Sequence, residues 1–159
     1  MANPNPILLQ FSTLDGFYSK IIQFGTWDWC SHVSLVLDDG SILDALPGKG
    51  VSVHPYIDYA RVERYAIKGL DADTSAKIIA FEKSQIGKPY DWSGIFDFGI
   101  RRNRNWKDDK AWFCSELQAA AFELSGFELV NTVNANRVAP KDLRWSPLLV
   151  YKSLTTIKK

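Results

Sequence analysis

The sequence contains only two cysteines and two histidines among its 159 residues. It lacks a Cys-x-x-Cys pair, a His-Glu-x-x-His motif and a glycine-rich phosphate loop, so the common sequence signals for zinc and nucleotide sites are missing. Two cysteines without a secretory leader do not indicate a disulfide framework. We therefore expect no metal ion and no organic cofactor.

Long apolar runs and strong charge are also missing. No segment approaches the roughly 18 apolar residues of a membrane helix. Residues 1–6 lack the basic region and apolar core of a secretory leader. The sequence thus predicts a cytoplasmic protein as synthesised, with delivery to the cell envelope left to lysis or specialised secretion. The formal net charge of +1 argues against nucleic acid as a partner, and the one basic cluster, residues 101–104, is either a solvated loop or an anion contact.

Hydrophobic residues make up 46% of the chain, which is enough for one core, and we expect a single domain over residues 1–159. Apolar alternation and turn signals predict strands and helices in an α+β order, with an antiparallel sheet whose strands mostly precede the last long helix. The predicted strands are residues 7–11, 31–37, 41–46, 51–54, 62–67 and 148–151, and the predicted helices are residues 15–24, 73–86, 93–100 and 113–124. In the first of these helices Phe17, Ile21 and Phe24 fall on one face.

Cys114 stands at the start of the helix predicted over residues 113–124. The free N–H groups and partial positive charge of a helix N-terminus favour a thiolate, and the same N–H groups can bind an oxyanion. Cys114 shares a helical face with Leu117, so its sulfur is expected to point toward the body of the protein. A buried core cysteine is the alternative interpretation.

His32 opens a predicted strand and is our candidate for the general base. If residues 38–40 form a three-residue loop with Gly40 in the left-handed region, Ser34 opposes Asp44 and His32 becomes a diagonal neighbour of Asp44 on the same face. A two-residue turn would instead move Asp44 to the other face. His54 is a rival for the base.

Cys30 shares the predicted face of His32, either as a packed bystander or as a second thiol near Cys114. The tryptophans are abundant for a chain of this length, and they either wall an aromatic cleft or pack in the core. The four that lie near the candidate site in sequence are Trp27, Trp29, Trp92 and Trp112.

Several of these segments resemble the circularly permuted NlpC-type papain-fold proteins, which are related to the lecithin–retinol acyltransferase-like proteins. The resembling segments are Ser31 to Leu37, Leu43-Asp44-Ala45, Gly87 to Asp91, Trp112 to Leu117 and Ala139 to Leu143. The histidine strand precedes the cysteine helix here, which is the permuted order. The resemblance covers most of the chain and implies a papain-like fold, with an antiparallel sheet packed against the helix that carries the nucleophile.

The resemblance also implies a triad of Cys114, His32 and Asp44, with Tyr90, Trp112 and Ser115 as oxyanion or substrate-binding residues. The implied activity is a cysteine peptidase or amidase acting on a peptidoglycan-type peptide through a thioester. A lipid acyl hydrolase or acyltransferase with the same triad is the first alternative. A catalytically inactive papain-fold binding module and an unrelated α+β domain remain as further hypotheses.

Overall fold

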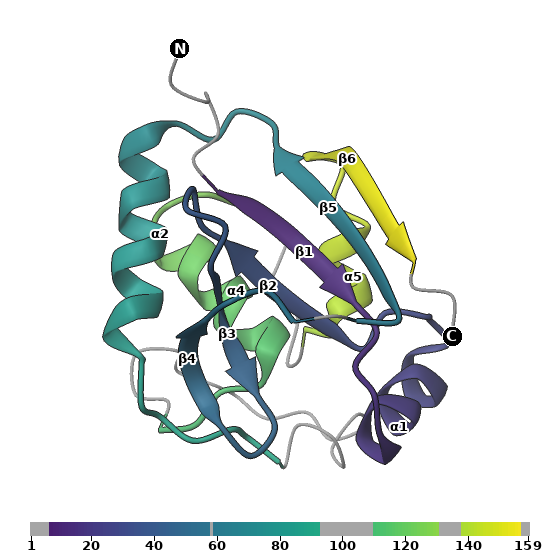
Figure 1. The fold of residues 1–159 in the computed structure, drawn as a ribbon. Coiled ribbons are helices and arrows are strands. Elements are labelled where there is room, and N and C mark those ends of the chain that lie inside the picture. The colour runs from purple at the N-terminus through teal and green to yellow at the C-terminus, as the bar shows by residue number, and fades with distance from the viewer. Residues whose placement is uncertain (1–6, 58, 93–109, 131–137, 157–159) are drawn as a thin grey trace.

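A computed structural model describes residues 7–57, 59–92, 110–130 and 138–156 of the chain. These residues form a six-stranded antiparallel sheet in the order β4-β3-β2-β1-β5-β6, flanked by helices (Figure 1). The expected α+β class and antiparallel sheet are confirmed. The strands are β1 (Leu8–Ser12), β2 (His32–Val36), β3 (Ile42–Leu46), β4 (Gly50–His54), β5 (Arg61–Ile67) and β6 (Leu149–Thr156).

The helices are α1 (Phe17–Thr26), α2 (Ala72–Ser84), α4 (Cys114–Leu124) and α5 (Pro140–Arg144). Figure 1 shows α4 behind β2 and β3, with α2 along the left edge of the molecule and α1 at the lower right. Helix α4 packs against both β2 and β3. Within the part of the chain described above, no helix has the length and apolar character needed to cross a bilayer.

The β2–β3 hairpin has the register predicted for a three-residue loop. Leu35 pairs with Leu43, so the same register places Ser34 opposite Asp44. Gly40 has a φ of +82°, a conformation that glycine adopts without the steric cost of a Cβ. Because side chains alternate along a strand, this register brings Asp44 to the face of the sheet that carries His32.

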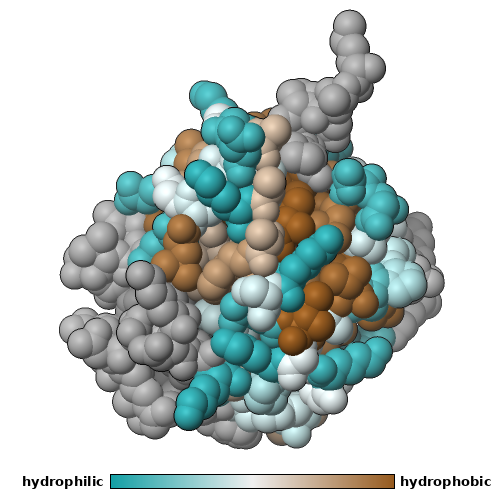
Figure 2. Space-filling model, turned by 90° about the vertical axis from the view of Figure 1, so that its left-hand side faces the viewer, coloured by the Kyte–Doolittle hydropathy of each residue, from teal (hydrophilic) through white to brown (hydrophobic). Residues whose placement is uncertain are grey.

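The core lies between the sheet and helix α4, and both faces of the central strands are covered. All five residues of β2 and all five of β3 are buried. Helix α4 is buried from Cys114 to Phe122, which fits its position against the sheet. Figure 2 views the molecule from the α2 side, where teal polar side chains are interspersed with brown apolar ones.

Most predicted elements occur within two or three residues of their expected bounds. The sequence analysis missed helix α5, which begins with Pro140 at a position where the missing N–H costs nothing. Strand β6 extends to Thr156, beyond the predicted end at residue 151, because it pairs with β5 through that length. The helix predicted over residues 93–100 and the basic cluster at residues 101–104 lie outside the described residues.

Candidate active site

Cys114 is the first residue of α4, and only 1% of its surface is exposed. The preceding residue, Phe113, occupies the N-cap position in an extended conformation, and its side chain has no oxygen that could accept from the first N–H groups. The thiol therefore lies where the partial positive charge of the helix is concentrated. The helix start is buried against β2 and β3, the strands that carry the other candidate residues.

His32 and Asp44 form a buried hydrogen bond across the β2–β3 hairpin. His32 Nε2 lies 2.7 Å from Asp44 Oδ2, and since the carboxylate accepts, Nε2–H is the donor. Neither residue has any exposed surface. The ring of His32 also stacks on Tyr59, with 6.5 Å between centroids and 29° between planes. These contacts fix the orientation of the imidazole.

Asp44 has a second imidazole partner. His54 Nε2 lies 3.1 Å from Asp44 Oδ1, and His54 Nδ1 lies 2.8 Å from the carbonyl oxygen of Pro55. Each carboxylate oxygen of Asp44 thus faces one histidine. In the β3–β4 pairing Asp44 opposes Ser52, so His54, two residues further along β4, points to the same side of the sheet.

The electrostatics of this cluster favour a charged imidazole. Burial lowers the pKa of His32, but the charge of Asp44 and then that of Cys114 overcome it, so the pKa is raised to about 10. Burial likewise opposes ionisation of Asp44, and the charge and hydrogen bond of His32 hold its pKa below the ordinary value. The hydrogen bond to Asp44 raises the pKa of His54, which is more exposed. Below about pH 10, His32 is therefore an imidazolium held by a carboxylate.

The second ring nitrogen of His32 is not engaged by Asp44. Nδ1 is buried and has no hydrogen-bond partner among the described residues. Cys114 lies close enough to His32 that it raises the pKa of the imidazole, after Asp44. Among the residues selected from the sequence, His32 and Asp44 are thus hydrogen-bonded, and Cys114 belongs to the same electrostatic cluster.

The other residues expected at the site have separate environments. Tyr90 is 5% exposed, and its ring lies 5.7 Å from that of Phe113, the residue before Cys114. Burial and then the charge of Cys114 raise the pKa of its hydroxyl. Trp112 is completely buried, and its indole N–H donates to Gln85 at 3.1 Å. The hydroxyl of Ser115 donates to the carbonyl oxygen of Val138 at 2.5 Å. Trp112 and Ser115 therefore hold the surroundings of Cys114 together, and neither offers a free polar group to a substrate.

A close backbone approach positions Tyr90. Gly50 has a φ of +73°, and a Cβ there would lie 2.3 Å from the carbonyl oxygen of Lys88. That carbonyl accepts from the N–H of Val51, and Trp112 donates its backbone N–H to Pro89. The segment containing residues 87–90 is thereby tied both to β4 and to the residues that precede the nucleophile helix.

Cys30 is buried, and its contacts are those of a residue that packs next to the site without taking part in it. Its thiol donates to the backbone carbonyl of His32 at 3.2 Å, and the residue is completely buried. Burial raises the pKa of this thiol far above its ordinary value, with a smaller contribution in the same direction from Cys114. Both cysteines are free thiols.

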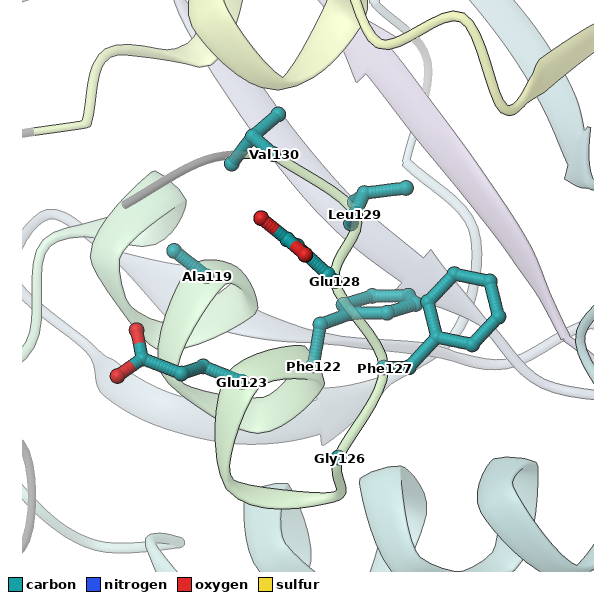
Figure 3. Close-up of a pocket in the computed structure, with 8 residues that line it drawn as sticks. All are labelled: Ala119, Phe122, Glu123, Gly126, Phe127, Glu128, Leu129 and Val130. Atoms are coloured by element: carbon teal, nitrogen blue, oxygen red, sulfur yellow. The ribbon is translucent and has the colours of Figure 1, made fainter. Parts of the chain in front are cut away.

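A separate cavity of about 310 Å³ lies at the far end of α4. Ala119, Phe122, Phe127 and Leu129 contribute apolar walls, and the rings of Phe122 and Phe127 lie edge to face with centroids 5.9 Å apart (Figure 3). None of the candidate catalytic residues lines it. We therefore do not assign the candidate chemistry to this cavity.

Comparisons with known proteins support the fold alone. No protein-family model matches the chain, and no curated protein matches its sequence. A structural match is the crystal structure of the metalloprotein yiiX from Escherichia coli O157:H7, described as DUF1105. The match has a TM-score of 0.76 and 18% sequence identity, and it covers 97% of this chain and 99% of that chain.

These comparisons correct the family assignment made from the sequence. The structural neighbour is described as a DUF1105 metalloprotein, and no family model supports membership in the permuted NlpC-type family. The segments that carried the resemblance are short. A histidine within an apolar strand and a cysteine at a helix start are local features that unrelated sequences also contain.

Proposed function

We propose that the chain is a cysteine hydrolase that transfers an acyl group from an amide or ester to water. The observation that carries the proposal is the buried hydrogen bond between His32 Nε2 and Asp44, which leaves Nδ1 of the imidazole without a partner in the electrostatic cluster that includes Cys114. A helix-borne thiol that faces a strand-borne imidazole is a papain-like arrangement, and we propose the same for the fold. Amide hydrolysis is the first candidate reaction, and acyl-lipid hydrolysis or acyl transfer is the second.

In the proposed reaction, the Cys114 thiolate attacks the carbonyl carbon and the carbonyl oxygen becomes an oxyanion. The bond to the leaving group then breaks, and protonated His32 gives its Nδ1 proton to the departing amine or alcohol. A water molecule attacks the thioester, with neutral His32 taking its proton. The bond between the acyl carbon and the sulfur then breaks, the carboxylic acid leaves, and the imidazole keeps the proton, so that the thiolate–imidazolium pair is restored. Asp44 stays ionised throughout and stabilises the imidazolium.

The oxyanion requires hydrogen-bond donors beside the sulfur. The N–H groups at the start of α4 are one source, since the side chain of the N-cap residue, Phe113, does not accept from them. The Tyr90 hydroxyl is the second, because its pKa is raised and it remains a donor at neutral pH. We assign Trp112 and Ser115 to positioning of the helix start, in line with their hydrogen bonds to Gln85 and Val138.

The metal named for the structural neighbour does not fit this cluster. No group of three or more His, Cys, Asp or Glu side chains among the described residues is arranged to hold a metal ion. The two histidines direct their Nε2 atoms at opposite oxygens of Asp44, so these atoms do not converge on a common point. We therefore route no step of the proposed reaction through a metal.

Alkylation of Cys114 by iodoacetamide tests the proposal. Rates are compared between pH 5.5 and 8.5 in a Cys30→Ser background and in the same background with His32→Ala. Because His32 is protonated over this range, we expect fast alkylation below pH 7 that collapses without His32. Alkylation that follows an ordinary thiol pKa of about 8.5 and ignores His32 would contradict the proposal.

Hydrolysis itself requires a second measurement. Chromogenic peptide amides and acyl esters of graded chain length are incubated with the wild type and with Cys114→Ala. Turnover that is lost in the variant would support an enzyme and rank the two substrate classes. A reactive thiol without turnover of either class would favour the inactive binding module.

A further inference from the structure

Helix α1 presents part of its apolar stripe, Phe17 and Phe24, to the solvent. These two side chains, seven residues or about two helical turns apart, are 73% and 76% exposed. Ile21 between them is partly buried and packs against the core, and the buried face contains Ile22 beside Ser19 and Thr26. The two aromatic side chains thus lie outside the core that the isoleucines of α1 contact.

The residue that ends α1 extends this surface. Trp27 is 88% exposed and has a φ of +54°, and it is the one non-glycine residue with positive φ in the described part of the chain. Its ring stacks on Phe24, with centroids 5.9 Å apart. The left-handed conformation ends α1 at its C-cap, where the Trp27 N–H donates to the carbonyl oxygen of Gln23, although a bulky side chain adopts it at a steric cost.

We propose that Phe17, Phe24 and Trp27 form a docking surface for a phospholipid bilayer, with α1 lying in the plane of the interface. Tryptophan and phenylalanine are the side chains that interfacial helices insert between headgroups. The exposed cation Lys20 flanks the stripe, where it can reach lipid phosphates. Within α1 no residue is acidic, and the carboxylate of Asp28 beyond it is paired with Arg144.

The dimensions favour a bilayer over a second copy of the chain. Ten residues make a helix about 15 Å long, and one face of it is small beside the roughly 800 Å² that each partner buries in a stable protein interface. An interfacial helix needs no complementary partner surface. Figure 1 shows α1 at the edge of the molecule, away from α2 and α4.

A series of ring contacts leads from α1 toward the candidate active site. Tyr18 of α1 packs on Trp92 at 4.8 Å between centroids, and Trp92 packs on Tyr90 at 5.3 Å. The ring of Tyr90 in turn lies 5.7 Å from that of Phe113, the residue before Cys114. The docking proposal does not depend on the proposed hydrolase activity, so Cys114→Ala should bind vesicles as the wild type does.

Vesicle sedimentation of the full chain tests the inference. The probes are phosphatidylcholine vesicles and vesicles of phosphatidylcholine with phosphatidylglycerol, with partition coefficients measured at low and high salt. The test variant is Phe17→Ser/Phe24→Ser/Trp27→Ser. The matched control is Tyr151→Ser/Leu154→Ser, which removes two half-exposed apolar side chains from β6. Thermal unfolding verifies that both variants fold.

We expect the wild type and the control to bind both vesicles, more tightly when the anionic lipid is present. The triple variant should bind at least tenfold more weakly. Absence of wild-type binding, or equal binding by the triple variant, would overturn the inference. Sedimentation equilibrium measures the oligomeric state. A wild type that is a dimer and a triple variant that is a monomer would assign the surface to a second copy of the chain and would also overturn the inference.

Discussion

Replacing Asp44 by Asn tests the electrostatic centre of the candidate site. The amide keeps the shape of the carboxylate and an oxygen that can accept from His32 Nε2, but it removes the charge. Without that charge, burial, which is the largest influence on His32 and lowers its pKa, is opposed only by Cys114. We therefore expect the pKa of His32 to fall from about 10 to near or below its ordinary value of 6.5.

The size of the effect follows from the pKa. At about 1.4 kcal/mol per pKa unit, a shift from 6.5 to about 10 corresponds to roughly 5 kcal/mol of preference for the imidazolium. Asp44 supplies the largest favourable part, and removing one member of a buried pair costs about 3–5 kcal/mol in other proteins. We expect Asp44→Asn to lose about 3 kcal/mol at pH 6, because its amide retains a hydrogen bond.

The sign of the pH dependence is fixed by the raised pKa. Stabilisation by protonated His32 is fully present below pH 6.5 and is lost as the pH rises through about 10. For each proton that the folded state binds in excess of the unfolded state, the free energy of unfolding falls by about 1.4 kcal/mol per unit rise in pH. The wild type should therefore lose stability between pH 6.5 and 8.5, and Asp44→Asn should lose much less.

Two measurements check this prediction. Urea unfolding between pH 6.5 and 8.5 gives the slope, and long-range proton–nitrogen NMR spectra give the pKa. The chain has only two histidines, so a His54→Gln background leaves His32 as the single imidazole signal. A His32 that titrates near 6.5 with Asp44 present, or one whose pKa does not change in Asp44→Asn, would refute the reasoning.

Three further predictions concern the surroundings of the site. Gly50→Ala should lower the free energy of unfolding by about 2–4 kcal/mol in urea titrations, because its Cβ would meet the carbonyl oxygen of Lys88, whereas the control Gly48→Ala has open space and should cost about 1 kcal/mol. Glu82 is buried with a pKa well above the ordinary value, so wild-type stability falls as the pH rises above 4.5, and Glu82→Gln should gain about 1–3 kcal/mol at pH 7 but nothing at pH 4. His54→Ala should lower kcat for any hydrolysed substrate about tenfold through loss of its hydrogen bond to a carboxylate, with partial recovery in His54→Gln.

The sequence predicted the hairpin that unites His32 and Asp44 because the signal was local. The Asp-Asp-Gly turn limits the loop to two lengths, and the glycine favours the one that the structure contains. The start of the helix at Cys114 was equally local, since an apolar and alanine-rich repeat begins there. These elements required no knowledge of the rest of the chain.

Contacts between segments far apart in the chain could not be predicted from such local signals. Periodicity shows that Phe17 and Phe24 share a face of α1, but it does not show whether that face meets the core or the solvent. Similarly, nothing near Trp112 indicates that its indole reaches Gln85, 27 residues away in the chain. The contact of His54 with Asp44 could have been found, because a short turn after β3 places both side chains on one face of the sheet.

The length of the loop between β2 and β3 constrains the chemistry of the candidate site. Asp44 links the two histidines, and the face to which it points is set by the three-residue loop, residues 38–40, of the β2–β3 hairpin. Removing one of those residues would turn Asp44 toward the opposite face while His32 stayed buried. The imidazole would then lose its counter-charge in a dry environment, where burial favours the neutral form. The loop at residues 38–40 contributes no group to the proposed triad, yet its length decides whether the proposed base, His32, is an imidazolium or a neutral ring.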